Sequence, residues 1–245
     1  MKKLLLAVLL AVGFTTAQAQ LTGNLSLTSD YRFRGISQTQ NGAAVQGGVD
    51  YAHESGLYIG NWNSSVSSQQ YTNGSGLESD IYGGWKKDIY KGLTFDVGSY
   101  NYFYPSSATG TNTSFNTQEL YVGLGYGPVS AKYSQSLGNY FGMYNTVGTK
   151  YSQADLSQSL GIITDELKDL SFVAHYGHTA VANNSQYSYN DINIGAAYAL
   201  PKDFTLAVKW YTNTATSSAF NTANTSNGRQ LYKDAWVASI TKTFE

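Results

Sequence analysis

Residues 21–35 read LTGNLSLTSDYRFRG, and their side chains alternate between two classes. The odd-numbered positions are mostly apolar or small, and they are Leu21, Gly23, Leu25, Leu27, Ser29, Tyr31, Phe33 and Gly35. The even-numbered positions are all polar, and they are Thr22, Asn24, Ser26, Thr28, Asp30, Arg32 and Arg34. Because successive side chains of a strand point to opposite faces, this stretch predicts a strand with one apolar and one polar face.

The same two-residue alternation recurs along most of the chain. It predicts about twelve strands, at residues 22–35, 43–53, 56–65, 77–86, 92–103, 117–126, 129–137, 146–155, 169–178, 188–199, 203–213 and 234–244. The alternation is weakest at 56–65 and 146–155. No amphipathic helix pattern stands out between these segments, so we expect an all-β protein.

The connections between the expected strands alternate in length. Short ones fall at 53–56, 86–92, 127–128 and 200–203, and longer polar ones at 35–42, 63–76, 105–116, 136–145, 178–187 and 213–234. Only 156–168 is long where a short connection is expected. This alternation is typical of an up-and-down antiparallel transmembrane β-barrel. No plug or inward-folding loop is evident in the sequence, although 213–234 is long enough to cover a mouth.

The composition agrees with a barrel and excludes several other classes. Only 13% of residues are charged, 14% are aromatic, and there are 21 Tyr, 25 Gly and no Cys. These values argue against a coiled coil, a disulfide-stapled domain and a thiolate metal site. A net charge of −1 gives no basic footprint for nucleic acid. A sheet survives in hydrocarbon only by closing on itself, which gives alternation at low average hydropathy.

The two ends of the chain carry export and assembly signals. Lys2 and Lys3 precede an apolar run at 4–14, and Ala17-Gln18-Ala19 offers small residues for cleavage before Gln20. We therefore expect residues 1–19 to be a signal peptide and residues 20–245 to form the barrel. Outer-membrane barrels usually end in an aromatic residue that the assembly machinery reads. Here Phe244 is the expected signal, followed by the additional Glu245.

Strand parity assigns a set of charged side chains to the lumen. They are Asp30, Arg32, Arg34, Asp50, Glu78, Asp80, Asp96, Glu119, Lys132, Lys150, His175, Asp191 and Lys209. Their mixed signs predict weak ion selectivity, with a slight preference for cations. The charges at positions 30, 32 and 34 have two interpretations. They could form a binding site that orients an anionic solute, or they could pair with opposite charges across a narrow interior. The second is favoured, since interior charges are often structural.

Nothing in the sequence points to catalysis, a cofactor or a metal. The three histidines, His53, His175 and His178, have no recognisable partner motif, and no hydrolase, metalloprotease or nucleotide-binding motif is present. The run Gly123-Leu124-Gly125-Tyr126-Gly127 lies on an expected strand and is interpreted as barrel packing.

Three segments near the N-terminus resemble the opening of a known family. Ser29-Asp30-Tyr31-Arg32-Phe33-Arg34-Gly35-Ile36-Ser37-Gln38, then 43–51, then Gly56-Leu57-Tyr58-Ile59-Gly60-Asn61-Trp62 are similar to the TorF family of proteobacterial porins. The resemblance is specific over residues 25–66 and looser beyond them. It implies an outer-membrane β-barrel and solute passage.

Together these features predict a porin in the outer membrane of a Gram-negative bacterium. It would allow passive diffusion of small polar solutes through a water-lined lumen. Its expected partners are outer-membrane lipid, periplasmic chaperones and the barrel-assembly machinery. A closed structural or ligand-recognition barrel acting through its loops is the main alternative, and a lipid-modifying enzyme at the outer rim is a weaker one.

Overall fold

The computed structural model describes residues 20–68, 70–71, 76–105, 114–215 and 230–245. The expected signal peptide at 1–19 lies outside the described residues, as does most of the expected loop at 213–234. Within the described part, no helix is long and apolar enough to cross a membrane.

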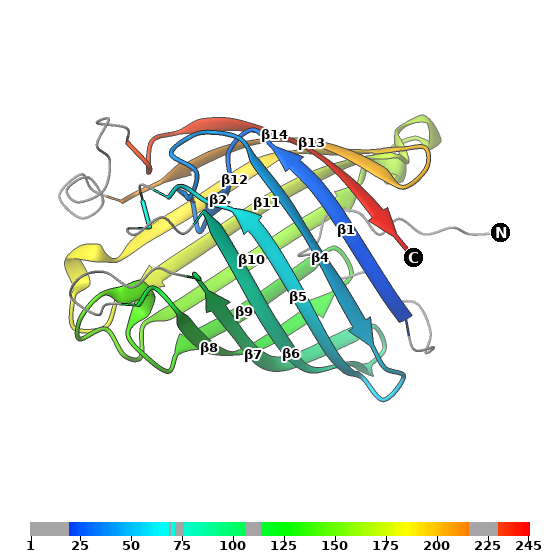
Figure 1. Ribbon diagram of the computed structural model, residues 1–245. Coiled ribbons are helices and arrows are strands. Elements are labelled where there is room, and N and C mark those ends of the chain that lie inside the picture. The colour runs from blue at the N-terminus through cyan, green and yellow to red at the C-terminus, as the bar shows by residue number, and fades with distance from the viewer. Residues whose placement is uncertain (1–19, 69, 72–75, 106–113, 216–229) are drawn as a thin grey trace.

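Twelve antiparallel strands of the described chain form one closed barrel (Figure 1). The strands are β1 (Gln20–Thr28), β4 (Ala44–Ala52), β5 (Leu57–Ser65), β6 (Leu77–Tyr90), β7 (Leu93–Phe103), β8 (Thr117–Tyr126), β9 (Val129–Ser136), β10 (Lys150–Ser159), β11 (Leu170–Ala180), β12 (Tyr189–Leu200), β13 (Phe204–Asn213) and β14 (Ala235–Phe244). Strands adjacent in this sequence pair with one another, and β14 pairs with β1 to close the ring. The predicted fold class and strand number are confirmed.

Three of the predicted strands differ from the structure by four or more residues at one end or both. The strand expected at 77–86 continues to Tyr90. The strand expected at 22–35 ends at Thr28, because the chain then leaves the barrel wall. The strand expected at 146–155 instead spans Lys150–Ser159, because residues before Lys150 belong to the preceding loop.

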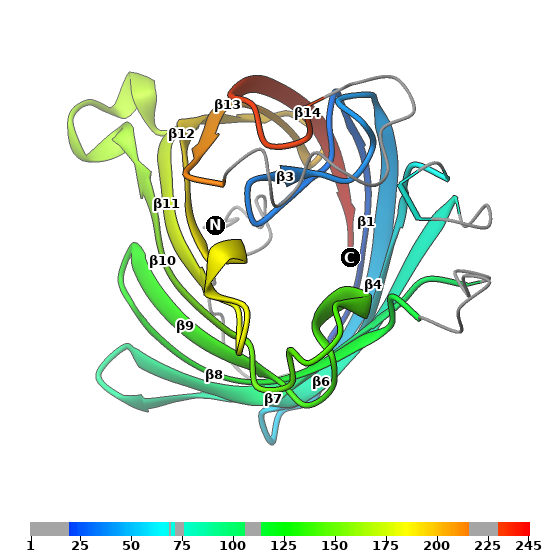
Figure 2. The same ribbon diagram turned by 90° about the vertical axis from the view of Figure 1, so that its left-hand side faces the viewer.

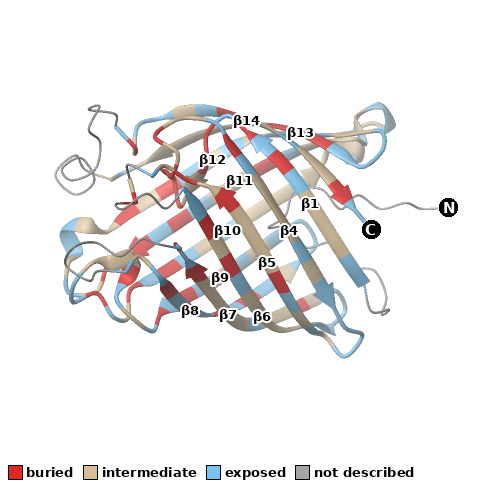
Figure 3. Ribbon diagram, in the orientation of Figure 1, coloured by how far each residue is buried: buried red, intermediate tan, exposed pale blue. Residues whose placement is uncertain are grey.

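The barrel is apolar outside and polar inside. Figure 3 shows buried and exposed residues alternating along its strands. Its outward side chains are exposed and apolar, for example Leu25, Val49, Leu120, Ile194 and Val208. Its fully buried side chains are polar, and they are Ser37, Ser64, Glu78, Asp80, Glu119, Ser136, Thr146, Thr149, Thr179 and Asp191. A soluble protein has the opposite distribution. The apolar exterior is therefore suited to contact with lipid, and the interior to polar groups.

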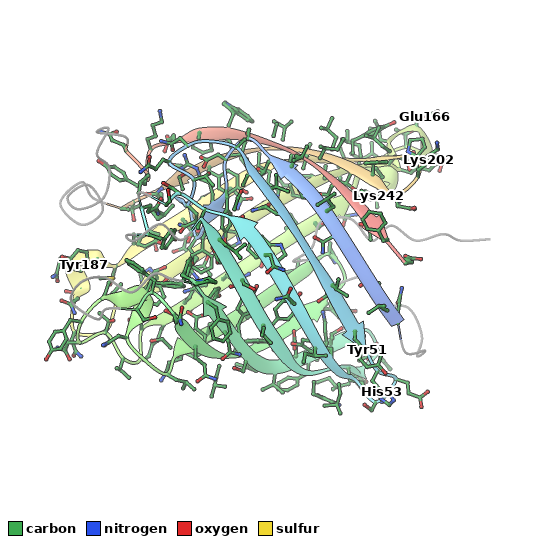
Figure 4. All side chains as sticks on the ribbon, viewed as in Figure 1. Tyr51, His53, Glu166, Tyr187, Lys202 and Lys242 are labelled. Carbon is green, nitrogen blue, oxygen red and sulfur yellow. The ribbon has the colours of Figure 1, made fainter. Side chains whose placement is uncertain are left out.

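The two ends of the barrel differ as the loop lengths predict. Short connections, the start of β1 and the end of β14 lie at one end, which we call the turn end (Figure 1). The long connections lie at the opposite end, the loop end. Figure 4 places Tyr51, His53, Glu166, Lys202 and Lys242 at the turn end and Tyr187 at the loop end. The long exception between β10 and β11 folds into η2 (Leu160–Ile162) and η3 (Asp165–Leu167).

A charge on the outward face should destabilise the barrel far more than one on the inward face. Ile194 is exposed near the middle of β12, and its neighbour Asn193 faces the lumen. We expect Ile194→Arg to lower the free energy of unfolding in bilayer vesicles by about 2–4 kcal/mol, because the outward face contacts hydrocarbon. Asn193→Arg is the matched control and should cost much less. Equal losses for both variants, in denaturant titrations followed by tryptophan fluorescence, would contradict this assignment of faces.

Candidate functional site

The connection between β1 and β4 folds into the barrel instead of extending away from it. It forms a small hairpin from β2 (Arg32–Phe33) and β3 (Ile36–Ser37), and Figure 2 shows β3 inside the ring of strands. The turn between them, Arg34-Gly35, has positive φ values of 48° and 79°. Such values at both central residues are the geometry that suits a tight two-residue hairpin. The expectation that no loop folds inward was therefore wrong.

Asp30 holds the base of this hairpin. Its Oδ1 accepts hydrogen bonds from Ser37 Oγ at 2.6 Å and Thr39 Oγ1 at 3.2 Å, and its Oδ2 accepts one from Arg32 Nε at 2.7 Å. Arg32 also donates to the carbonyl oxygens of Gly35 and Lys233. Asp30 and Arg32 thus fold the hairpin and join it to the segment before β14.

Arg34 lies at the tip of the hairpin and reaches the far wall of the barrel. It forms two hydrogen bonds to the Glu119 carboxylate, at 2.9 and 2.7 Å, and a third to Tyr140 Oη at 2.9 Å. Its guanidinium also lies 4.0 Å from the centre of the Tyr151 ring. Glu119 and Tyr151 belong to β8 and β10, which lie across the ring from β1. The hairpin therefore crosses the lumen.

The Arg34–Glu119 pair is buried, with side-chain exposures of 6% and 2%. Burial alone lowers the pKa of the Arg34 guanidinium, but the facing Glu119 carboxylate outweighs this, so that pKa lies well above its usual range. Arg34 therefore remains charged. A bidentate, charge-assisted pair of this kind is among the stronger polar contacts in proteins.

Apolar contacts fix both sides of the hairpin. On one side, Phe33 packs edge-on against Tyr102 and Phe141, with ring centroids 5.4 Å apart in each case. On the other side, Ile36 is buried with Tyr189 and Leu231. Phe141 belongs to η1 (Tyr140–Gly142), so the β9–β10 loop also contributes to the constriction. The result is a packed bridge across the loop end of the barrel.

Most of the charged residues assigned to the lumen do lie inside the barrel. Asp30, Arg32 and Arg34 do so in the hairpin instead of on a strand. The others lie on inward faces of strands, and they are Asp50, Glu78, Asp80, Asp96, Glu119, Lys132, His175, Asp191 and Lys209. Among positions 30, 32 and 34, both arginines pair with carboxylates, which agrees with the structural interpretation of these charges.

The prediction that Lys150 faces the lumen was wrong, because Lys150 is exposed on the outward face of β10. Tyr151, the next residue, is buried inside, so odd-numbered positions of β10 face the lumen. Asp155 shares that parity and was missed because the strand was assigned the wrong phase. Lys86 was also missed, although it has the same parity as Glu78 on β6.

His175 lies within a network of carboxylates on the inner wall. Its Nδ1 is 2.6 Å from Asp155 Oδ1, and its Nε2 is 3.0 Å from Asp191 Oδ1 and 2.9 Å from Tyr151 Oη. Both ring nitrogens are thus engaged, which suits a structural role more than a nucleophile's base. His178 contacts Asn190, while His53 contacts Ser55 within the exposed turn after β4.

Cationic and anionic groups are unevenly distributed around the inner wall. Lys86 lies directly opposite Asp96 in the β6–β7 register, and Lys132 lies over the Tyr121 ring. On β4 and β6, by contrast, Asp50, Glu78 and Asp80 form no ion pair with any described residue.

Tyrosines take the place of cations beside these three acids. Tyr82 donates to Asp50 at 2.5 Å, Tyr100 to Asp80 at 3.1 Å and Tyr31 to Glu78 at 3.1 Å. Tyr82 and Tyr100 also stack, with ring centroids 4.9 Å apart. Gly60 lies between Asp50 and Tyr82 in the register, and a Cβ there would overlap both side chains. This wall is consequently rich in phenol groups that are hydrogen-bonded to carboxyl groups.

Removing one member of the Arg34–Glu119 pair should free the hairpin. We expect Arg34→Gln or Glu119→Gln to cost about 3–5 kcal/mol in local stability, because each leaves a buried charge unpaired. The double variant should lose less than the sum of the two, with a coupling of about 1–3 kcal/mol. Hydrogen exchange of the backbone amides at 31–38 measures this opening. Unchanged exchange in both single variants would show that the pair does not hold the hairpin.

Comparisons with known proteins agree with this architecture. The KdgM porin shares 8% identity, with a TM-score of 0.57, over 91% of this chain and 99% of that chain. A KdgM porin in complex with disordered oligogalacturonate shares 7% identity, with a TM-score of 0.56, over 92% of this chain and 99% of that chain. The NanC porin in a rhombohedral crystal form shares 10% identity, with a TM-score of 0.55, over 92% of this chain and 100% of that chain. At these identities the similarity shows a shared barrel fold.

The sequence comparisons are more limited. No curated protein matches the chain, and the resemblance to the TorF family is not confirmed. One family model, described as "Bacterial protein of unknown function (Gcw_chp)", matches residues 14–244. Because that match covers nearly the whole barrel, the chain belongs to the Gcw_chp family.

Proposed function

We propose that this protein is an outer-membrane porin that allows small polar solutes to diffuse through its lumen. The observation that carries the proposal is the inverted distribution of side chains, with Glu78, Asp80 and Asp191 inside and apolar residues outside. Such a barrel can place a polar path across hydrocarbon. The named fold neighbours KdgM and NanC, both described as porins, support the same role.

Two features of the lumen would select the solute. The hairpin narrows the loop end, since Arg34 bridges to Glu119 across the barrel. In addition, Asp50 lies partly exposed on the inward face of β4 and forms no ion pair with any described residue. A KdgM complex contains oligogalacturonate, whose carboxylates the Asp50 carboxylate would repel. We therefore propose a preference for neutral or cationic solutes.

The location follows from the same proposal. Residues 1–19 would direct export and then be cleaved. Phe244 is half exposed on the outward face of β14, where the barrel-assembly machinery could read it. Periplasmic chaperones would accompany the unfolded chain, and outer-membrane lipid would surround the folded one. Membership of the TorF family remains part of this proposal.

The porin function predicts discrete conductance steps in planar bilayers. Arg34→Ala should increase the conductance of each step, because it releases the bridge across the lumen. Lys150→Ala, on the outward face, is the control and should leave the conductance unchanged. If the unaltered protein gives neither conductance steps nor liposome swelling, the channel proposal fails while the barrel stands.

The uneven charge of the lumen predicts opposite effects of two substitutions. Asp50→Asn should reduce the preference for K⁺ over Cl⁻, because it removes an uncompensated lumen carboxylate. Lys209→Gln should increase that preference, because it removes an inward cation. The zero-current potential across a KCl gradient measures both effects. A shift of the same sign in the two variants would show that lumen charge does not set selectivity.

The hairpin also supports a second function, a closed barrel that recognises an external ligand through its loops. Its packing against Tyr102, Phe141 and Tyr189 closes part of the loop end. Absence of solute flux together with ligand binding that depends on the loops would favour this alternative. Flux through the unaltered protein would favour the porin.

A further inference from the structure

A polar patch interrupts the apolar outer face of the barrel. It lies on the neighbouring strands β5, β6 and β7, and it consists of Asn61, Asn63, Ser79, Ser99 and Asn101. We call these five residues the amide patch. The weak alternation of the expected strand at 56–65 reflects part of it.

The amide patch faces outward and not into the lumen. Asn61 and Asn63 share the parity of Leu57 and Ile59, which are 59% and 57% exposed. Their even-numbered neighbours Gly60 and Ser64 are buried inside.

Exposed apolar side chains flank the patch along all three strands. They are Leu57, Ile59, Leu77, Ile81, Val97 and Phe103. The patch therefore lies within the apolar band and not at its rim.

Outward positions near the middle of other strands have a different character. They include Leu25 on β1, Val122 on β8, Ile194 on β12, Val208 on β13 and Ile240 on β14, all of them exposed. Acyl chains cover such residues favourably, but they offer no hydrogen bonds to amides. The amide patch is thus poorly matched to lipid.

Hydrogen bonds within the patch use only part of its capacity. Asn61 Nδ2 donates to the Asp80 carbonyl at 2.7 Å, and Asn63 Nδ2 donates to Asn61 Oδ1 at 2.5 Å. Asn101 Nδ2 donates to the Ile81 carbonyl at 3.0 Å and to Ser99 Oγ at 3.4 Å, and Asn61 Nδ2 also donates to Ser79 Oγ at 3.5 Å. Each side-chain amide has two N–H donors and an acceptor with two lone pairs. The patch can therefore both donate to and accept from a facing surface.

A depression of about 390 Å³ borders the amide patch on the same outer face. It is lined by Val49, Tyr51, Ile59, Gly60, Asn61 and Ile81, from β4, β5 and β6. On the other edge of the patch, β7 carries the exposed Val97 and Phe103. One edge of the patch is hollowed, and the other carries exposed apolar side chains.

We propose that the amide patch is the contact surface between two copies of this chain in the membrane. Two copies with the same orientation are related by an axis along the membrane normal, which sets the patches face to face at equal depth. That axis also sets the apolar β7 edge of each copy towards the hollowed β4 edge of the other. Amides can pair across such a contact, and the small serines allow close approach. The proposal rests on the membrane location but not on channel activity.

Cysteine cross-linking tests this contact directly, because the chain contains no Cys. Ser79→Cys places a near-isosteric thiol within the patch. Ala196→Cys is the matched control, since Ala196 is exposed on the outer face of β12, across the ring from β6. The full chain carrying either variant is reconstituted in bilayers at low protein-to-lipid ratio and treated with a short bismaleimide. We expect the cross-linked dimer from Ser79→Cys to exceed the control by about tenfold.

A second variant separates loss of contact from loss of folding. Adding Asn63→Leu and Asn101→Leu to Ser79→Cys makes the patch apolar and compatible with lipid. The cross-linked dimer should fall to the control level, while heat-modifiable gel mobility shows that the barrel remains folded.

Three outcomes would overturn the proposal. They are equal cross-linking of Ser79→Cys and Ala196→Cys, cross-linking that survives the leucine substitutions, and a monomer for Ser79→Cys at every protein-to-lipid ratio. Any of them would mean that lipid covers the amide patch. Because none depends on conductance, the result is independent of the porin proposal.

Discussion

The structure depends on the need to pair every backbone N–H and C=O group in a medium without water. A sheet with free edges cannot meet that need in hydrocarbon, whereas a closed ring can. The pairing of β1 with β14, between the two ends of the chain, completes the ring. Once the ring is closed, each strand has one face towards lipid and one towards the lumen. The polar interior follows from this closure.

Placing acids and bases inside a barrel creates a second requirement, since buried charges are costly unless they are compensated. The hairpin meets part of it, because Arg34 reaches Glu119 and Arg32 reaches Asp30. His175 does the same for Asp155 and Asp191. The wall bearing Asp50, Glu78 and Asp80 relies on tyrosine hydroxyls instead. Glu78 and Asp80 are fully buried, so among these three acids Asp50 is the one that is partly exposed.

The hairpin connects folding with the proposed transport. Its tip residue Arg34 has a positive φ, which is unfavourable for a side chain other than glycine. The contacts made by its guanidinium compensate for that cost. Residues 29–38 are one of the three stretches that carry the family resemblance, and they contain the hairpin that forms this bridge. Interactions that stabilise the loop end would therefore also shape the proposed solute path.

Strand number, strand faces and the alternation of loop lengths could be read from the chain because they are local properties. The alternation at 21–28 and the inward parity of Glu78 and Asp191 needed only neighbouring residues. The inward hairpin could not be predicted, because 29–35 continues the same alternation after the chain has left the wall. Arg34 meets Glu119 across a separation of 85 residues. That contact depends on the curvature that brings β8 opposite β1, and only the closed barrel has it.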